Sequence, residues 1–197
     1  MNIKRLFSYQ QKNYLKKILR LEGVKNSDII PYIKKALHSD IISVLDIGCG
    51  RLWENNPKSE DILFSLFDEL RYEITGIDIF NECIAWRKKN GPRGKYLIMD
   101  ARNLKNLPEK FDVVIAHHIL EHFPKHESIA LLNLIEKKAL KQIIIGTPIG
   151  YTETEYAVKL HRNKHERHLC AWYPKEFKKR GYNVLKLKNV LLAIKNV

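Results

Sequence analysis

The sequence has no apolar run that approaches the ~20 residues needed to span a bilayer. Its N-terminus is basic but lacks the continuous apolar segment of a secretory signal. Cysteine is scarce: Cys49, Cys83 and Cys170 lie far apart and are odd in number. Such a set fits a reducing compartment better than a disulfide framework. We therefore expect a cytoplasmic protein with no membrane span.

Signatures of several other protein classes are also missing. The sequence has no internal repeat, no low-complexity linker, no G-x-S-x-G elbow of hydrolases and no H-E-x-x-H run of metalloproteases. What is present is ordinary for a globular domain, with 45% hydrophobic and 29% charged residues in a chain of 197. A chain of this length favours one domain with a substantial core.

Acidic residues are in deficit near both ends of the chain. The net charge is +13, of which residues 1–25 hold +6 and residues 159–188 hold +8, whereas residues 26–158 hold −2. Basic flanks attract anions such as nucleic acid, phosphorylated glycans or an acidic membrane surface. A solvated basic surface that only keeps the protein soluble explains them equally well, so the charge leaves the partner open.

Apolar strands alternate with helical stretches, which is the pattern of a parallel sheet with crossover helices. Five parallel strands are expected, and two further strands can pair as an antiparallel hairpin at the edge. The predicted fold class is therefore α/β, a Rossmann-like doubly wound sheet of seven strands that is mostly parallel. The expected strands are residues 41–46, 73–79, 95–99, 111–116, 141–146, 182–188 and 190–196.

The expected helices lie at residues 2–21, after Ser27, after Pro57, at 82–90, at 126–140 and from Pro174 to near Gly181. Ser27 is a fair N-cap, and it would place Pro31 in the first turn, where proline is tolerated. Helical spacing of apolar residues predicts that Leu70 is buried in the third of these helices and Ile129 in the fifth, beside Leu132 and Ile135.

The most informative stretch is the sequence VLDIGCG at residues 44–50. An apolar strand runs there into an acid, Asp46, and two glycines one residue apart. In an α/β sheet, such glycines let the chain turn tightly and let a ligand approach bare backbone amides. Ligands in these sheets bind beyond the carboxyl ends of the strands. Asp78, Asp100 and His117 stand at the corresponding ends of the next three strands.

VLDIGCG resembles the first motif of the class I S-adenosylmethionine-dependent methyltransferases, and the expected order of elements over residues 27–197 is similar to theirs. Leu120-Glu121-His122 resembles the family's segment after the fourth strand. The chain thus looks like a methyltransferase type 11-like enzyme. The resemblance implies S-adenosyl-L-methionine as cofactor. It also implies a single domain with an N-terminal helical cap (1–40), a cofactor-binding core (41–146), and a substrate loop with the C-terminal hairpin (147–197).

The resemblance also implies how the first motif contacts the cofactor. Gly48 and Gly50, with Cys49 between them, would let the methionine part lie against the backbone. Asp46 would orient this elbow or the cofactor's amino group, and His117 would lie near the cofactor.

The ends of the second and third strands match the family's adenosine contacts. Asp78 would accept hydrogen bonds from the ribose hydroxyls, Ile79 would pack on the adenine, and Asp100 with the amide of Ala101 would recognise the exocyclic amine. Each acid taken alone has a plainer explanation, since Asp78 can be a loop acid and Asp100 an Asx-turn residue or helix cap.

One position departs from the family pattern. The family's first motif often has a third small residue two positions after Gly50, where this chain has Leu52 followed by Trp53. The contacts of the following loop are therefore left open. The same departure argues against a dinucleotide site, because G-x-G-x-x-G would need glycine or alanine at position 53.

Histidines supply the candidates for a general base. A hydroxyl acceptor benefits from a base whose pKa is near the operating pH, and histidine suits that task. Our candidates are His117, His118 and His165. An amine or thiol acceptor would need little help from a base.

A second cluster, His161, His165, His168 and Cys170, raises the question of zinc. Structural zinc sites usually contain paired ligands such as C-x-x-C, which this chain lacks. The interleaved basic residues indicate an acceptor-binding loop equally well, and we expect no metal.

These observations favour an S-adenosylmethionine-dependent methyltransferase that acts on the oxygen or nitrogen of a small-molecule, anionic or glycan-type acceptor. Two alternatives remain: an RNA or DNA methyltransferase, and a non-catalytic nucleic-acid-binding module of the same fold. The basic flanks, with Tyr9, Tyr14, Trp172 and Tyr173, suit phosphate contacts and base stacking. An N-P-P-[YFW] tetrad of amino-directed nucleic-acid enzymes is absent. The sequence leaves the oligomeric state open.

Overall fold

The computed structural model describes residues 25–51, 57–155, 158–159 and 163–197. The helix expected at 2–21, together with Leu52, Trp53 and His161, lies outside these described residues.

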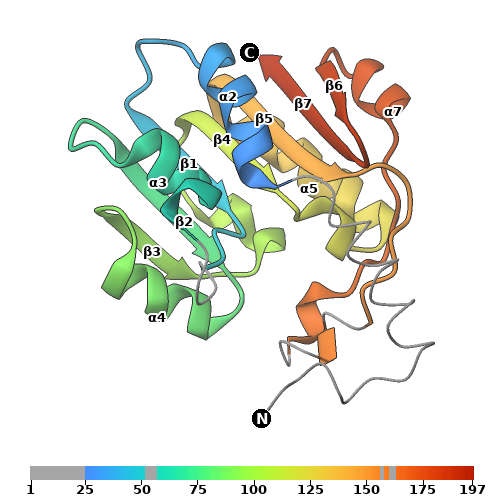
Figure 1. The fold of residues 1–197 in the computed structure, drawn as a ribbon, viewed down its shortest axis with the longest axis horizontal. Helices are drawn as coiled ribbons and strands as arrows, with labels where there is room; N and C mark the ends of the chain where they lie inside the picture. The colour runs from blue at the N-terminus through green and yellow to red at the C-terminus, as the bar shows by residue number, and fades with distance from the viewer. Residues whose placement is uncertain (1–24, 52–56, 156–157, 160–162) are drawn as a thin grey trace.

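The described chain forms one seven-stranded sheet with the order β3-β2-β1-β4-β5-β7-β6 (Figure 1). The first five strands run parallel, and β7 runs antiparallel between β5 and β6. This arrangement confirms the predicted fold class and the C-terminal hairpin at the edge. The strands are β1 (Ser43–Ile47), β2 (Glu73–Asp78), β3 (Gly94–Ile98), β4 (Phe111–His117), β5 (Ala139–Pro148), β6 (Asn183–Leu187) and β7 (Val190–Asn196).

Helices cover both faces of the sheet, so the central strands are buried on both sides. In β4 every residue except the last is buried. This is why β1, β4 and β5 have continuous apolar runs instead of the alternation of a half-exposed strand. The helices are α2 (Asn26–Ala36), α3 (Ile62–Phe67), α4 (Asn81–Asn90), α5 (Lys125–Lys138) and α7 (Pro174–Lys178), with 3-10 turns η2 (Lys58–Glu60), η3 (Ala101–Asn106), η4 (Leu120–His122) and η5 (Lys164–Glu166).

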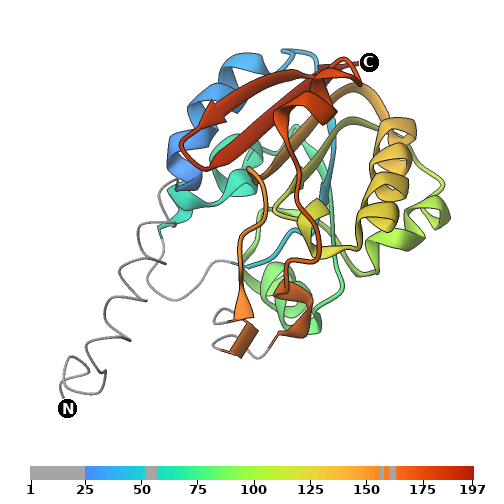
Figure 2. The same ribbon diagram turned by 90° about the vertical axis from the view of Figure 1, so that its right-hand side faces the viewer.

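Two separate apolar clusters fill the space between the sheet and its helices. Residues of α2, α3 and α4 pack against one face, and residues of η3, α5 and α7 pack against the other. Figure 2 shows α2 and α3 on the opposite side of the sheet from α5. The carboxyl ends of the parallel strands are left to loops, and this is where a ligand can enter.

The start of α2 differs from the sequence prediction. The helix begins at Asn26 with Lys25 as N-cap, and the Asp28 carboxylate accepts a hydrogen bond from the Lys25 amide at 3.1 Å. Ser27 is therefore inside the first turn, where its hydroxyl donates to Glu60 at 2.7 Å. Pro31 lies within the helix instead of its first turn, so both expectations are wrong.

Two residues predicted to face the core are exposed. Leu70 is 87% exposed because α3 ends at Phe67. Ile129 of α5 is 37% exposed, and the buried side of that helix consists of Ser128, Leu131, Leu132 and Ile135. Within the described residues, no helix combines the length and the apolar character required to cross a membrane.

Candidate cofactor and active site

A cavity of about 460 Å³ opens at the carboxyl ends of the parallel strands. That size falls in the ordinary range for small-molecule sites. The end of β2 and the turns that follow β1, β2, β3 and β4 line it, together with the segment around η5. The sequence-predicted site residues that line it are Gly48, Gly50, Asp78, Ile79, Asp100, Ala101, His118 and His165.

The glycine elbow after β1 forms one wall of this cavity. Gly48 and Gly50 have φ angles of 70° and 53°, in the left-handed region that favours glycine. The amides of Gly48 and Cys49 donate to the Ile77 carbonyl at 2.8 and 3.0 Å, which ties the elbow to β2. A Cβ atom at position 48 would lie 1.8 Å from Cδ1 of Ile119. Glycine at 48 is thus required both by the backbone angle and by close packing.

Asp78 joins the end of β2 to the elbow. Its Oδ2 accepts the Gly50 amide at 3.0 Å, and its Oδ1 accepts the Phe80 amide at 2.8 Å. Burial raises the pKa of this carboxyl, although the two amide bonds oppose the shift. Each carboxylate oxygen has a second acceptor position. The geometry therefore leaves acceptor capacity for two ligand hydroxyls at the end of β2.

Asp100 has the structural role that the sequence left as an alternative. It is the N-cap of η3, and its side chain accepts the Arg102 amide at 2.9 Å. The Arg102 guanidinium forms an ion pair with Asp100 at 2.6 Å and with Glu127 at 3.1 Å. The hydrogen bond from Arg102 holds the pKa of Asp100 below its usual value. A ligand at this end of the cavity would meet a paired carboxylate next to the Ala101 amide.

Arg87 is a buried part of the elbow that the sequence did not reveal. Its Nε donates to the carbonyls of Cys49 and Gly50, both at 3.0 Å, and its Nη2 lies 2.6 Å from the Asp61 carboxylate. Asp46 is also buried, and burial raises its pKa to about 7 in spite of the nearby Arg87 charge. Arg87 stands in the sequence W-R-K-K-N, which resembles a solvated helix end. No local signal separates it from its exposed lysine neighbours.

Three predicted site residues, Asp46, Cys49 and His117, do not line the cavity. The ring of His117 packs directly against Gly146. A Cβ atom built on this glycine would lie only 2.0 Å from Cδ2 of His117. Its Nε2 is buried and has no hydrogen-bond partner among the described residues. Burial lowers the pKa of His117 well below its usual value, so the ring is neutral. Among the candidate bases, the geometry favours His118.

His118 is held in an unusual backbone position and faces the cavity. Its φ is 55°, and its amide donates to the Gly146 carbonyl at 2.8 Å. Its Nδ1 lies 3.0 Å from Oε1 of Glu121, whose Oε2 accepts the Thr147 hydroxyl at 3.0 Å. Burial by itself would raise the pKa of Glu121. The His118 hydrogen bond and the nearby histidines outweigh this effect and lower the pKa to about 2. With Nδ1–H donated to an ionised carboxylate, Nε2 of His118 is left as an acceptor.

The segment before α7 packs against η4. The amides of Leu169 and Cys170 donate to the Glu121 carbonyl at 2.7 and 3.2 Å. This brings His168 next to His122, with ring centroids 4.9 Å apart. Burial lowers the pKa of His168 to about 4. His165 lines the cavity, and Cys170 donates instead to the Leu120 carbonyl.

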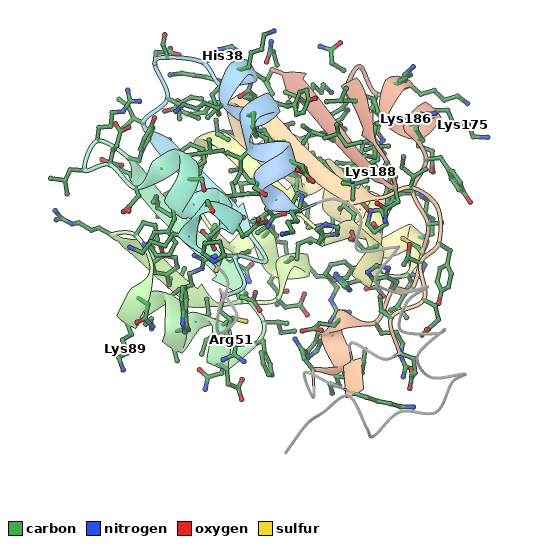
Figure 3. The ribbon with its side chains drawn as sticks, in the orientation of Figure 1. His38, Arg51, Lys89, Lys175, Lys186 and Lys188 are labelled. Atoms are coloured by element: carbon green, nitrogen blue, oxygen red, sulfur yellow. The ribbon has the colours of Figure 1, made fainter. Side chains whose placement is uncertain are left out.

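Several lining residues were not predicted. Three of the polar ones come from loops or turns whose approach depends on tertiary packing. Arg51, labelled in Figure 3, follows the elbow directly. Asn163 and Glu166 flank His165 in the η5 segment. Proximity to a motif residue is the only signal that the sequence offered for any of them.

The sequence matches the methyltransferase domain family over residues 6–186. No curated protein matches the chain significantly. The fold is similar to that of magnesium protoporphyrin IX methyltransferase from Synechocystis PCC 6803 with bound SAH (S-adenosylhomocysteine), with 14% identity, a TM-score of 0.58, and coverage of 96% of this chain and 88% of that chain.

Two other solved structures show the same fold. N-methyltransferase NodS from Bradyrhizobium japonicum WM9 has 13% identity and a TM-score of 0.59, covering 86% of this chain and 93% of that chain. The plantazolicin methyltransferase BpumL in complex with SAH has 16% identity and a TM-score of 0.58, covering 86% of this chain and 81% of that chain. Since the family match extends over most of the sequence, the chain belongs to the methyltransferase domain family and has the class I S-adenosylmethionine-dependent methyltransferase fold.

Proposed function

We propose that this methyltransferase binds S-adenosylmethionine in the cavity at the carboxyl ends of β1, β2 and β3, and methylates a hydroxyl or amine of a small-molecule acceptor. The observation that carries the proposal is the convergence of Gly48, Gly50, Asp78 and His118 on one cavity. Bound there, S-adenosylmethionine supplies an electrophilic methyl group on a positively charged sulfur. The chain's own residues have to bind the cofactor, align the acceptor with its methyl group and exclude water.

The donor and acceptor groups around the cavity fit this ligand. Asp78 offers acceptor positions for two ribose hydroxyls, and the left-handed glycine at position 50 leaves its Cβ side open, with the nearest atom 3.9 Å away. The walls hold four carboxylates, Asp78, Asp100, Glu127 and Glu166, against two guanidinium groups, Arg51 and Arg102, so acidic groups are in excess. A cationic sulfonium is favoured in such surroundings.

His118 is our candidate for the general base. It lines the cavity, its side chain is 40% exposed, and Glu121 fixes the tautomer that leaves Nε2 as proton acceptor. His117, which is packed away from the cavity, would then serve to orient the turn. His165 remains a second candidate on the facing η5 segment.

The acceptor class is supported by the size of the site and by the named neighbours. Those structures belong to methyltransferases of magnesium protoporphyrin IX and plantazolicin and to the N-methyltransferase NodS. None of the described lysines and arginines of the C-terminal flank is among the residues that line the cavity; Lys175 and Lys186, for example, belong to α7 and β6 (Figure 3). A nucleic-acid acceptor, a cytoplasmic location and the three-part domain division stay predictions.

The cofactor assignment is tested by ligand-induced stabilisation. A ligand at 100 times its Kd stabilises the native state by about 2.7 kcal/mol, so SAH should raise Tm by several degrees. The Asp78→Ala variant should lose this shift, whereas Glu82→Ala, an exposed carboxylate of α4, should keep it. An Asp78→Ala variant that binds SAH with unchanged affinity in calorimetry would refute the assigned contact.

The acceptor class is tested with cofactor that has a labelled methyl group. The enzyme is incubated with cell extract, and labelled products are separated by size and identified by mass spectrometry. The proposal predicts a labelled small molecule that His118→Asn forms at a reduced rate. Label found only in RNA, DNA or protein would overturn the assigned acceptor class.

A further inference from the structure

Glu121, His122 and His168 form a cluster of potential metal ligands, of which the proposed methyl transfer uses only Glu121, as the hydrogen-bond partner of His118. One ligand atom from each residue lies within 4.8 Å of the other two. Two of these residues belong to η4, and the third is 46 positions further along the chain. The Leu169 and Cys170 amides hold the two segments together through the Glu121 carbonyl.

Each side chain in the cluster is oriented by a second partner. His122 Nδ1 lies 3.3 Å from the Arg167 carbonyl, and the ring of His168 is hydrogen-bonded to the backbone of Thr152. Metal-bound histidines usually donate their other ring N–H to a backbone carbonyl or carboxylate, which fixes the tautomer and points the free nitrogen at the ion. The Thr147 hydroxyl supports the Glu121 carboxylate in the same way.

We propose that Glu121, His122 and His168 bind one divalent transition-metal ion at the wall of the cavity. Two imidazoles and one carboxylate are donors that suit Zn²⁺, Mn²⁺, Fe²⁺ or Co²⁺ better than Mg²⁺ or Ca²⁺, which prefer oxygen ligands. Metal–ligand bonds of ~2.1 Å place neighbouring ligand atoms about 3–4 Å apart. Small side-chain rotations would bring the three atoms to that spacing.

The site borders the place where the acceptor is expected. His122 lines the cavity, as do His118 and Leu169. Three protein ligands leave one or more coordination positions open. We assign these positions to an oxygen of the acceptor, a role that rests on the proposed function. Metal binding itself does not depend on that function.

This inference replaces the expectation of no metal, and its ligands differ from the cluster considered for zinc. Of that cluster only His168 takes part, because His165 faces the cavity and Cys170 is bonded to the Leu120 carbonyl. The partners of His168 come from the turn after β4, which no spacing rule connects to residue 168.

The test uses the tag-free full chain after treatment with a chelator. Zn²⁺ is titrated by calorimetry, and Co²⁺ is added as a spectroscopic probe because its visible absorption bands report the coordination. We expect one Zn²⁺ per chain and Co²⁺ bands that Zn²⁺ abolishes. Since loss of a second-shell partner alone weakens binding about 10–100-fold, His122→Asn and His168→Asn should each weaken it by about 100-fold or more.

The matched control is His126→Asn, an exposed histidine at the start of α5 with a side chain 83% accessible, which should bind Zn²⁺ as the wild type does. Stabilisation by SAH, measured on the same variants, verifies that they are folded. Absence of stoichiometric Zn²⁺ or Co²⁺ binding to the wild type, or wild-type affinity in His122→Asn or His168→Asn, overturns the inference. If the wild type does not bind SAH, the proposed function is overturned instead.

Discussion

Gly48 offers the sharpest test of how the elbow is built. A methyl group at this position meets two separate obstacles, a φ of 70° and the side chain of Ile119. The left-handed conformation costs an L-residue about 1–2 kcal/mol. The added Cβ would lie 1.8 Å from Ile119 Cδ1 and 2.5 Å from Cγ1. Overpacking of this kind costs about 1–3 kcal/mol after relaxation. Gly48→Ala should therefore destabilise the protein by about 2–5 kcal/mol.

A double-mutant cycle separates the two obstacles. Ile119→Ala removes the atoms that clash and, because the residue is partly buried, should by itself cost about 1–2 kcal/mol. In that background only the backbone cost of Gly48→Ala remains, about 1–2 kcal/mol. The double variant should thus be more stable than the sum of the single effects by about 1–3 kcal/mol.

The matched control is Gly50→Ala. Its φ of 53° imposes the same backbone cost, but the nearest atom to its Cβ is the Gly48 carbonyl oxygen at 3.9 Å. It should cost about 1–2 kcal/mol with or without Ile119→Ala. Urea unfolding of all variants measures these values. A coupling between Gly48→Ala and Ile119→Ala below about 0.5 kcal/mol would refute the assigned clash.

Two further predictions concern buried polar groups. The raised pKa of Asp46, about 7 against a usual 3.8, means that the native state holds this proton more tightly, so the stability it contributes is lost as the pH rises between those values. Measured by urea unfolding, the free energy of unfolding should fall less between pH 4 and pH 8 in Asp46→Asn than in the wild type, by a difference of at most about 4 kcal/mol. The same pH dependence in both proteins would contradict the burial effect. Ser128 Oγ accepts the Trp172 Nε1–H at 3.0 Å and donates to the Leu120 carbonyl at 2.6 Å. Ser128→Ala should cost about 2–4 kcal/mol in the same assay, whereas Ser39→Ala, at an exposed serine, should stay within about 0.5 kcal/mol. Equal effects would disprove the role of this network.

Local patterns located the strands and the elbow because each strand end is marked in its own sequence. Gly48, Gly50 and Asp78 each follow a run of apolar residues, and parallel strands bring such ends to one edge. Predicted and observed strand bounds accordingly differ by only a few residues. The order of elements predicted the fold class, and the VLDIGCG motif added the resemblance to a family.

Other expectations failed because a polar residue has a partner that is distant in the sequence. The buried side of α5 begins at Ser128, a polar residue that hydrophobic spacing cannot detect. Such spacing therefore assigns its neighbour Ile129 to the core instead. The hydroxyl of Ser27 is used by Glu60, a residue 33 positions away, so the helix start moved to Asn26. Such partners are set by packing and leave no local mark.

The surroundings of the cavity show the same limit. Arg87 reaches the elbow from α4, and His168 reaches Glu121 from a segment that precedes α7. Both contacts join segments tens of residues apart. The sequence identified the histidines as candidates for chemistry but could not tell which would meet.

The position of β7 between β5 and β6 has a consequence for synthesis on the ribosome. Until residues 190–196 emerge, β5 has an open edge along a stretch that includes Ile143, Ile144 and Ile145. An unpaired apolar edge of this kind is prone to join another chain. Nascent chains that stall before residue 190 should therefore be substrates for chaperones or aggregate, although every strand whose end borders the cavity has already been made.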